Sequence, residues 1–201
     1  MSDVDVHANT LALLQDISTG NAVARTQFDD GSTRILVTHS YAKKAGFQSV
    51  PAIYNMQVVG KGWETVEDVM YLFELTKKSG ETVKVWGYGI NSITDSVQPS
   101  DLSNIRSSFP HVPEDAFKKQ DERPVDILIG MNFFGLHPGG GTGKDKVGNL
   151  KALKSDFGCG WVIGGSDPRL KPSKVQLSAQ ALAMTTVCKV EMKPFKAKDF
   201  F

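Results

Sequence analysis

Short apolar runs separated by glycine and proline occur along the whole chain, and this pattern limits the possible fold more than any other feature. The sequence contains 19 Gly and 9 Pro, and both residue types are spread widely. Glycine and proline mark turns, and short apolar runs between turns are typical of strands rather than of long helices. The sequence therefore predicts a mostly β protein built from many short strands.

The first part of the chain predicts three strands and two turns. Apolar and β-branched runs at Thr10–Ile17, Ala22–Phe28 and Ile35–Thr38 predict the strands. A hairpin turn at Ser18–Asn21 joins the first two, because its glycine and asparagine tolerate positive φ angles. The second turn, at Asp29–Thr33, joins the second strand to the third.

The rest of the chain predicts a short helix, more strands and one long irregular stretch. Asn91–Pro124 is polar and contains four prolines, so we expect an irregular excursion there. Val125–Gly130 is rich in Ile, Leu and Val, so we expect it to contain the most buried strand. The remaining expectations are a helix at Ser40–Ala45 that ends at Gly46, strands at Met56–Trp63, Leu153–Ile163 and Ala181–Met192, a hairpin of Val69–Thr76 with Thr82–Tyr88, and a loop at Ser166–Gln176.

Composition and charge narrow the class of molecule. The chain has 201 residues, of which 40% are hydrophobic, which is enough for the core of one domain. Lys plus Arg (23) nearly balances Asp plus Glu (22), which argues against nucleic-acid or membrane-surface binding through bulk charge. No apolar run approaches the roughly 18 residues of a membrane span, and the acidic N-terminus is unlike a signal peptide. We therefore expect a cytoplasmic domain at residues 9–192, preceded by a flexible tail at residues 1–8.

The sequence contains no clear motif for binding a metal ion or a phosphate group. Cys159 and Cys188 match no zinc spacing, so we expect free thiols, with a disulfide as the less favoured alternative, and no metal or other cofactor. The glycine-rich run Gly139–Lys144 lacks the glycine spacing of a phosphate-binding loop, and Asp145 stands where Ser or Thr should follow. The scattered histidines are expected in loops or at the surface: His39, His111 and His137.

An acidic triplet at a turn between apolar strands carries the clearest chemical signal. Asp29-Asp30-Gly31 lies between the apolar runs Val23–Phe28 and Ile35–Val37. In aspartic peptidases two carboxyl groups approach closely and share one proton, so that one activates water and the other protonates the substrate carbonyl. The glycine lets the turn pass close to a neighbouring loop, and the flanking strands hold the carboxylate rigid. Because such triplets are common in ordinary turns, a second element is needed.

That second element follows much later in the chain. Ile127-Leu128-Ile129-Gly130 is an apolar strand that ends in glycine, and Met131–Phe134 after it is compatible with a short helix. In aspartic peptidases such a strand packs behind the catalytic loop, and its glycine avoids a clash with that loop. The two elements together, in this order, favour an aspartic peptidase over an ordinary turn.

Both elements and their surroundings resemble one known family. From Leu11 to its end, the chain is similar to the peptidase domain of Pao/Bel-type LTR retrotransposons. The final residues resemble the stretch that leads into the reverse transcriptase, which implies a linker at residues 193–201 toward a following polyprotein domain. The segments that carry the resemblance are Phe28–Thr33, Val37-Thr38, Ala42–Phe47, Asp126–Met131, Phe157-Gly158, Gly160–Gly165 and Phe195–Phe201.

The resemblance implies a retropepsin-like fold of the acid protease type. Each subunit would be a closed β-barrel with one short helix after the Ile-Leu-Ile-Gly strand, and the excursion would be an addition. Two copies would form a homodimer that cuts an extended peptide or its own polyprotein, within the retroelement particle or polyprotein. The implied roles are Asp29 as catalytic residue, Asp30, Gly31 and Ser32 in the active-site loop, Ile127, Leu128, Ile129 and Gly130 in the supporting strand, and Val58, Val59, Gly60, Lys61, Gly62 and Trp63 in the flap.

The residue after the catalytic aspartate departs from the family's pattern. The family usually has Ser or Thr there, whose hydroxyl group donates and accepts hydrogen bonds across the dimer, whereas an ionised Asp30 can only accept. Two copies of Asp29 and of Asp30 near one axis would repel each other, so we expect a weaker dimer at neutral pH. The alternative function is therefore a catalytically silent module, which keeps the fold for dimerisation or peptide binding.

Overall fold

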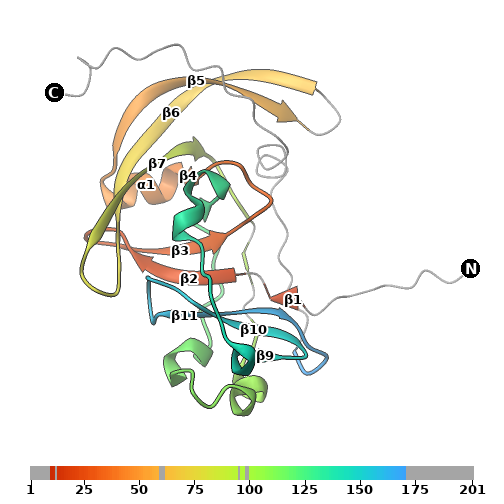
Figure 1. The fold of residues 1–201 in the computed structure, drawn as a ribbon. Coiled ribbons are helices and arrows are strands. Elements are labelled where there is room, and N and C mark those ends of the chain that lie inside the picture. The colour runs from red at the N-terminus through yellow and green to blue at the C-terminus, as the bar shows by residue number, and fades with distance from the viewer. Residues whose placement is uncertain (1–9, 12, 59–61, 95, 98–99, 171–201) are drawn as a thin grey trace, which may run out of the picture.

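The computed structural model describes residues 10–170 except residues 12, 59–61, 95 and 98–99, and strands dominate this part of the chain (Figure 1). This outcome confirms the mostly β class that the turn-rich sequence predicts. The strands are β1 (Thr10–Leu11), β2 (Leu13–Ser18), β3 (Val23–Phe28), β4 (Leu36–Thr38), β5 (Gln48–Val58), β6 (Gly62–Thr76), β7 (Thr82–Ile90), β8 (Ile127–Ile129), β9 (Lys146–Val147), β10 (Asn149–Lys154) and β11 (Trp161–Ser166). The helices are α1 (His39–Ala45) and the 3₁₀ helices η1 (Ser103–Ser108), η2 (Glu114–Phe117), η3 (Met131–Leu136) and η4 (Gly143–Asp145).

Most strands belong to one mixed sheet with the order β2-β3-β8-β4-β7-β6-β5. This sheet curls, because Ser18 of β2 also pairs with Thr76 of β6. Each of these residues is the last of its strand, so the two strands meet only at their ends. The closed β-barrel expected from the sequence is therefore wrong in detail: the sheet closes at a single bridge, and the long β5–β6 hairpin extends away from it (Figure 1).

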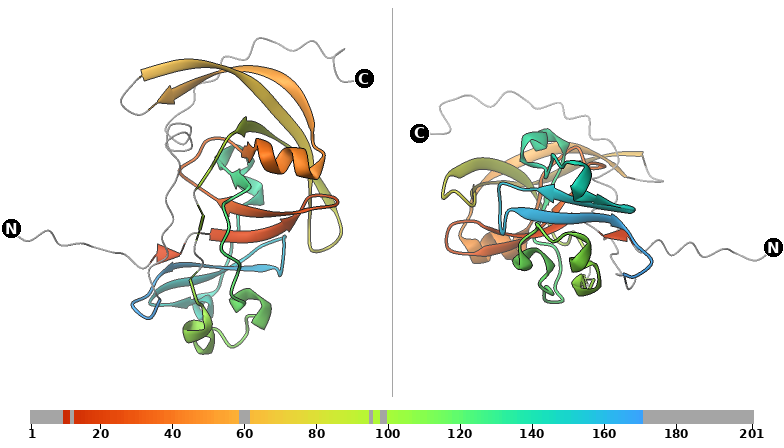
Figure 2. Two further views of the ribbon diagram at one scale, coloured as in Figure 1. Left: turned by 180° about the vertical axis from the view of Figure 1, so that it is seen from behind. Right: turned by 60° about the horizontal axis from the view of Figure 1, so that its bottom comes forward.

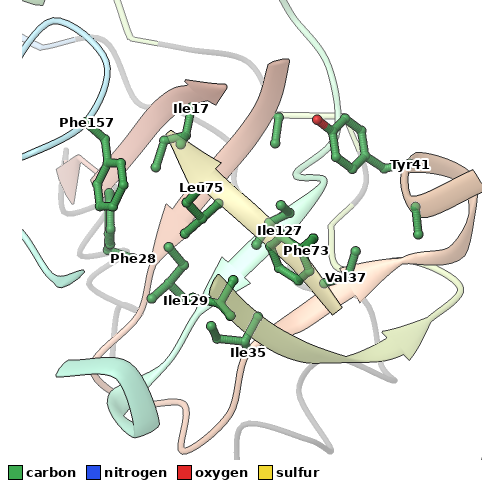
Figure 3. Packing of buried hydrophobic residues seen from close by; sticks show 13 residues of the cluster. Ile17, Phe28, Ile35, Val37, Tyr41, Phe73, Leu75, Ile127, Ile129 and Phe157 are labelled. Carbon is green, nitrogen blue, oxygen red and sulfur yellow. The ribbon is translucent and has the colours of Figure 1, made fainter. Parts of the chain in front are cut away.

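The strand β8 lies in the middle of this sheet, parallel to β3 and antiparallel to β4. Its residues Ile127–Ile129 are fully buried, as the sequence predicts. A strand with both faces covered needs apolar side chains at every position, which explains the unbroken apolar run. Figure 3 shows its two isoleucines inside the larger core cluster, whereas Leu128 packs on the opposite face with Leu36 and Tyr88.

The helix α1 follows β4 directly and is where the sequence predicts a short helix. Thr38 is its N-cap, and the side chain of Thr38 accepts a hydrogen bond from the N–H of Tyr41. Gly46 ends the helix in the left-handed conformation, with a φ of 74°. Tyr41 and Ala42 face inward and are buried in the larger core cluster, so the helix covers one side of it.

A second, smaller sheet has the strand order β1-β11-β10-β9 and lies at the end of the molecule opposite the β5–β6 hairpin (Figure 2). The single strand expected at Leu153–Ile163 is wrong, because a turn interrupts it and produces the hairpin of β10 and β11. Gly158 and Gly160 in this turn have φ angles of 51° and 88°. Such angles suit glycine and turn the chain out of the extended conformation.

Polar contacts join the two sheets. The side chain of Gln15 on β2 donates from Nε2 to the carbonyl of Phe157 (2.8 Å), and its Oε1 accepts from the Ser155 hydroxyl (2.7 Å). On the other side, Lys78 of the β6–β7 hairpin donates from Nζ to the carbonyl of Cys159 (3.1 Å). The β10–β11 turn is therefore attached to both β2 and the β6–β7 hairpin. Cys159 is a free thiol, and Cys188 lies outside the described residues.

The excursion Asn91–Pro124 has little regular pairing in its described part, as expected, since its pairing is a bridge between Val97 and Arg123. It is nevertheless packed against the second sheet rather than detached, which the sequence does not predict. Its 3₁₀ helices η1 and η2 supply apolar side chains to a third core cluster. The buried members of that cluster are Ile105, Phe109, Val112, Phe117, Leu150, Ala152, Ile163 and Leu170.

Some expectations fall outside the described residues. These are the strand at Ala181–Met192, the tail at residues 1–8, the linker at residues 193–201 and most of the loop at Ser166–Gln176. Among the helices that the structure describes, none is both long and apolar enough to cross a membrane.

Candidate active site

Asp29 follows the last residue of β3 and lies beside the end of β8. Its backbone N–H donates to the carbonyl of Ile129 (3.0 Å), which extends the pairing of the two strands by one residue. Its side-chain Oδ1 accepts from the N–H of Gly31 (2.9 Å), and its carbonyl accepts from the N–H of Ser32 (3.4 Å). These bonds fix a half-buried carboxylate at the edge of a tight turn.

Ser32 is buried inside the loop and stabilises it from within. Its hydroxyl donates to the carbonyl of Arg34 (2.9 Å) and accepts from the N–H of the same residue (3.3 Å). Its own carbonyl accepts from the N–H of Met131 (2.8 Å). Ser32, predicted to belong to the active-site loop, therefore connects the two ends of that loop and joins it to the segment after β8.

Gly130, which follows β8, packs directly against this loop. A Cβ atom placed on Gly130 would lie 2.4 Å from the carbonyl oxygen of Arg34 and 2.7 Å from that of Ser32. Both atoms belong to the backbone and have little freedom to move away. A side chain at this position is therefore incompatible with the observed packing, and the Asp29 turn meets the end of β8 here.

Asp30 lies on the outside of the turn. It is exposed, and no hydrogen bond or ion pair joins its side chain to another residue in the part of the chain that the structure describes. Asp29 and Asp30 thus differ: the carboxylate of Asp29 accepts a hydrogen bond within the loop, and that of Asp30 is exposed to solvent. Asp30 is free to meet another molecule.

The hairpin of β5 and β6 contains the segment predicted to be the flap. The two strands pair from Gln48 with Leu72 to Val58 with Gly62. Trp63 near the end is 50% exposed. The three residues at the tip, Val59, Gly60 and Lys61, lie outside the described residues, so the structure places the predicted flap only through its flanking strands.

Aromatic side chains of β5, β7 and η3 connect this hairpin to the loop region. The ring of Tyr54 on β5 lies 4.6 Å from that of Tyr88 on β7, centre to centre. Trp86 on β7 lies 5.9 Å from both Tyr88 and Phe133, which belongs to η3. The sequence signal for these contacts is the alternation Trp86-Gly87-Tyr88-Gly89. In a strand with aromatic residues on one face and glycine on the other, the glycine face lets neighbouring elements approach the backbone closely.

Close packing against one face of β7 explains why Gly87 and Gly89 alternate with the aromatic residues. A Cβ atom on Gly87 would lie 2.6 Å from Cγ2 of Ile35, and one on Gly89 would lie 2.4 Å from Cε1 of His39. The core and the start of α1 therefore approach β7 closely on this face. His39 uses the space to hydrogen-bond the hydroxyl of Tyr71 (2.9 Å) and to pair with Asp68 (3.3 Å), both on β6.

Buried polar atoms without a hydrogen-bond partner gather around the Asp29 turn. Within the described part of the chain, every such side-chain atom belongs to residues 26–34. Native proteins rarely leave buried polar groups unpaired, because each costs about 1–3 kcal/mol. These atoms lie on both sides of Asp29 in the sequence. The atoms are Thr26 Oγ1, Gln27 Oε1, Thr33 Oγ1 and Arg34 Nε.

A second half-buried carboxyl group, that of Asp126, lies just before β8. Its Oδ2 accepts from the backbone N–H of Arg25 (2.8 Å), and its carbonyl accepts from the N–H of Thr38 (3.0 Å). Burial raises the pKa of Asp126 above its ordinary value of 3.8, which the Arg25 N–H and the Arg123 guanidinium offset in part. Through its carboxyl group and its backbone carbonyl, Asp126 joins β3 and β4 to the start of β8, and it is separate from the Asp29 turn.

The histidine side chains form specific contacts that the sequence does not predict. His137 contacts the carbonyl of Gly130 through Nε2 (3.2 Å), and His111 pairs with Asp145 at 2.5 Å. Hydrogen bonds from Thr142, together with His111, lower the pKa of Asp145. Over the described residues, no group of three or more His, Cys, Asp or Glu side chains is arranged to hold a metal ion.

Comparison with known proteins adds no relative: no family model, no curated protein and no solved structure matches this chain. The function of this protein is therefore inferred from the geometry around Asp29 and from the sequence.

Proposed function

We propose that this protein is an aspartic endopeptidase with a retropepsin-like fold, in which two copies each supply Asp29. The observation that carries the proposal is the junction of three segments at Gly130. There β8 lies between β3 and β4, the Asp29 turn joins those two strands, and the absence of a side chain at Gly130 lets the turn pack against the end of β8. This arrangement holds a carboxylate rigidly on a short loop, as acid–base catalysis requires.

In the proposed dimer, the two Asp29 carboxyl groups share one proton. The ionised group takes a proton from water while the water oxygen bonds to the scissile carbonyl carbon, and the other group gives its proton to the carbonyl oxygen. The tetrahedral intermediate then collapses. Its carbon–nitrogen bond breaks as the nitrogen receives a proton from the first carboxyl group, and a hydroxyl proton returns to the second.

The proposed substrate is an extended peptide, in the first instance the retroelement polyprotein that contains this domain. The β5–β6 hairpin supports this proposal, because an exposed hairpin offers backbone groups for pairing with an extended chain. The aromatic contact between Tyr54 and Tyr88 connects this hairpin to the strand beside the Asp29 loop. A peptide lying between hairpin and loop would meet both backbone partners and the carboxylates.

The test is self-cleavage of a precursor that carries native flanking sequence. We expect the precursor with Asp29 to be cut, and the Asp29→Asn variant to stay intact because an amide cannot take the proton from water. Asp156→Asn serves as the matched control, since Asp156 is an exposed aspartate in the β10–β11 turn. Identical fragments from the precursors with Asp29 and with Asn in its place would rule out the peptidase.

The alternative is a catalytically silent module that dimerises or binds peptides. The exposed carboxylate of Asp30 favours this alternative, because like charges near a dimer axis oppose the close approach of the two Asp29 groups. An intact precursor, combined with a dimer in sedimentation experiments, would support this second function. A cut precursor that depends on Asp29 would exclude it.

A further inference from the structure

Arg34 lies between the Asp29 turn and the strands that lead to the β5–β6 hairpin. Its backbone forms one wall of the Gly130 junction, where the Ser32 hydroxyl bonds both its N–H and its carbonyl. Its guanidinium lies over the ring of Tyr88, with 5.9 Å between the guanidinium carbon and the ring centre. Tyr88 in turn contacts Tyr54 of the hairpin. A continuous set of contacts therefore leads from the Asp29 turn through Arg34 to the hairpin.

The guanidinium of Arg34 lacks an anionic partner in the described part of the chain. None of the ion pairs among the described residues includes Arg34, although Arg25, Arg106, Arg123 and Arg169 each pair with a carboxylate. Its Nε is buried without a hydrogen-bond partner, while the residue as a whole is half-buried. A half-buried guanidinium without an anionic partner keeps hydrogen-bond donors available, so this site favours a ligand that carries a negative charge and accepts hydrogen bonds.

We propose that Arg34 binds the carboxylate of an Asp or Glu side chain in the peptide held beside Asp29. The guanidinium presents donors in a planar fork that matches a carboxylate, and partial burial strengthens such a charge-assisted pair. The ring of Tyr88 lies against the guanidinium and stabilises it by a cation–π interaction. This proposal rests on the proposed function for the position of the peptide, and it deepens that function by assigning a substrate preference for an acidic residue near the cut bond.

Binding can be tested without cleavage, by nuclear magnetic resonance on ¹⁵N-labelled Asp29→Asn protein. The Nε–Hε signal of Arg34 is assigned by its loss in a variant that also carries Arg34→Gln. The probes are two pools of octapeptides that differ only in one fixed residue, Glu in one pool and Gln in the other. We expect the Glu pool to shift the Arg34 signal at concentrations about tenfold lower than the Gln pool. Equal shifts from both pools, or none from the Glu pool, would overturn the proposal.

Specificity is tested separately, by sequencing the products that the active protein cuts from a proteome-derived peptide library. We expect Asp and Glu to be enriched at one position near the cut bond, and we expect Arg34→Gln to reduce this enrichment about tenfold while Arg34→Lys keeps part of it. Arg106→Gln is the control, since Arg106 is exposed on η1 and pairs with Glu114. Cleavage without an acidic preference would contradict the proposal.

Two further outcomes separate this inference from the proposed function. If the library is not cut at all, the proposed peptidase fails, and the octapeptide titration still decides whether Arg34 binds carboxylates. If the Arg34 signal instead depends on protein concentration and changes with Asp30→Asn, the carboxylate comes from a second copy of this chain. That result would overturn the assignment to substrate.

Discussion

At Gly130 the candidate site depends on the absence of a side chain. We predict that Gly130→Ala destabilises the protein by about 2–3 kcal/mol, because the new methyl group meets backbone atoms of Arg34 and Ser32 that cannot move away cheaply. Urea unfolding followed by tryptophan fluorescence measures the change. Gly135→Ala is the control, since a Cβ atom there meets nothing within 4 Å. Equal losses in both variants would show that the junction is looser than its geometry indicates.

The carboxyl group of Asp126 predicts a pH dependence of stability. Its folded-state pKa is raised by burial above 3.8, so the folded state holds this proton more tightly than the unfolded state does. The contribution of Asp126 is therefore fully present at low pH and is lost as the pH rises through the raised pKa. In Asp126→Asn, whose amide oxygen can still accept from the Arg25 N–H, this loss should be absent.

The measurement for Asp126 is the free energy of unfolding of both proteins between about pH 3 and pH 7. We expect the native protein to lose stability relative to Asp126→Asn as the pH rises across this window. Parallel curves for the two proteins would contradict the prediction, because they would mean that burial does not affect the proton of Asp126.

Residue by residue, the sequence predicts those parts of the site that backbone geometry demands. Asp29 at a turn and Gly130 after an apolar strand are visible because few other residues suit a tight turn or a close backbone approach. The sequence does not predict a role for Arg34 in the same way. Its importance comes from a buried Nε and from Tyr88, which lies far away in the sequence, and no local pattern reports such contacts.

Among the elements, α1 offers a direct test of how the loop region is supported. We predict that Thr38→Val destabilises the protein by about 1 kcal/mol, because the N–H of Tyr41 loses its side-chain acceptor at the start of the helix. The valine keeps the volume of the buried threonine, so packing should change little. Thermal unfolding measures the effect, with Lys43→Ala, at an exposed position of the same helix, as control. No difference between the two variants would mean that the cap contributes nothing.

Elements defined by local signals are predicted well, and elements defined by distant pairing are not. The hairpin of β6 and β7 and the end of α1 follow from turn residues close to them in the chain. The error at Leu153–Ile163 also had a local cause, since Gly158 and Gly160 lie inside the expected strand and both adopt positive φ angles. The pairing of β1 with β11 joins opposite ends of the described chain, and no local pattern could reveal it.

For the whole molecule, the sequence predicts a mostly β protein but not the distribution of its core. The described residues form three buried clusters, one on each face of the larger sheet and one between the second sheet and the excursion. Apolar residues in Asn91–Pro124 are interrupted by prolines and polar residues, so their pattern has neither the period of a helix nor that of a strand. Their partners on β10 and β11 come later in the chain, which explains why the excursion looked irregular from sequence alone.

In the proposed assembly of two copies, the charge of Asp30 should weaken the dimer. In the proposed dimer two exposed Asp30 carboxylates lie near the axis and repel each other when ionised, because nothing among the described residues neutralises them. Asp30→Ser should therefore tighten the dimer about tenfold at low ionic strength, and it should have little effect at about 1 M salt, where exposed charges are screened. Sedimentation equilibrium at both salt concentrations measures the dissociation constants, with Asp156→Ser as the control for loss of an exposed charge. A dimer that is equally strong with Asp or Ser at position 30 would show that the two active-site turns do not approach each other as the proposal requires.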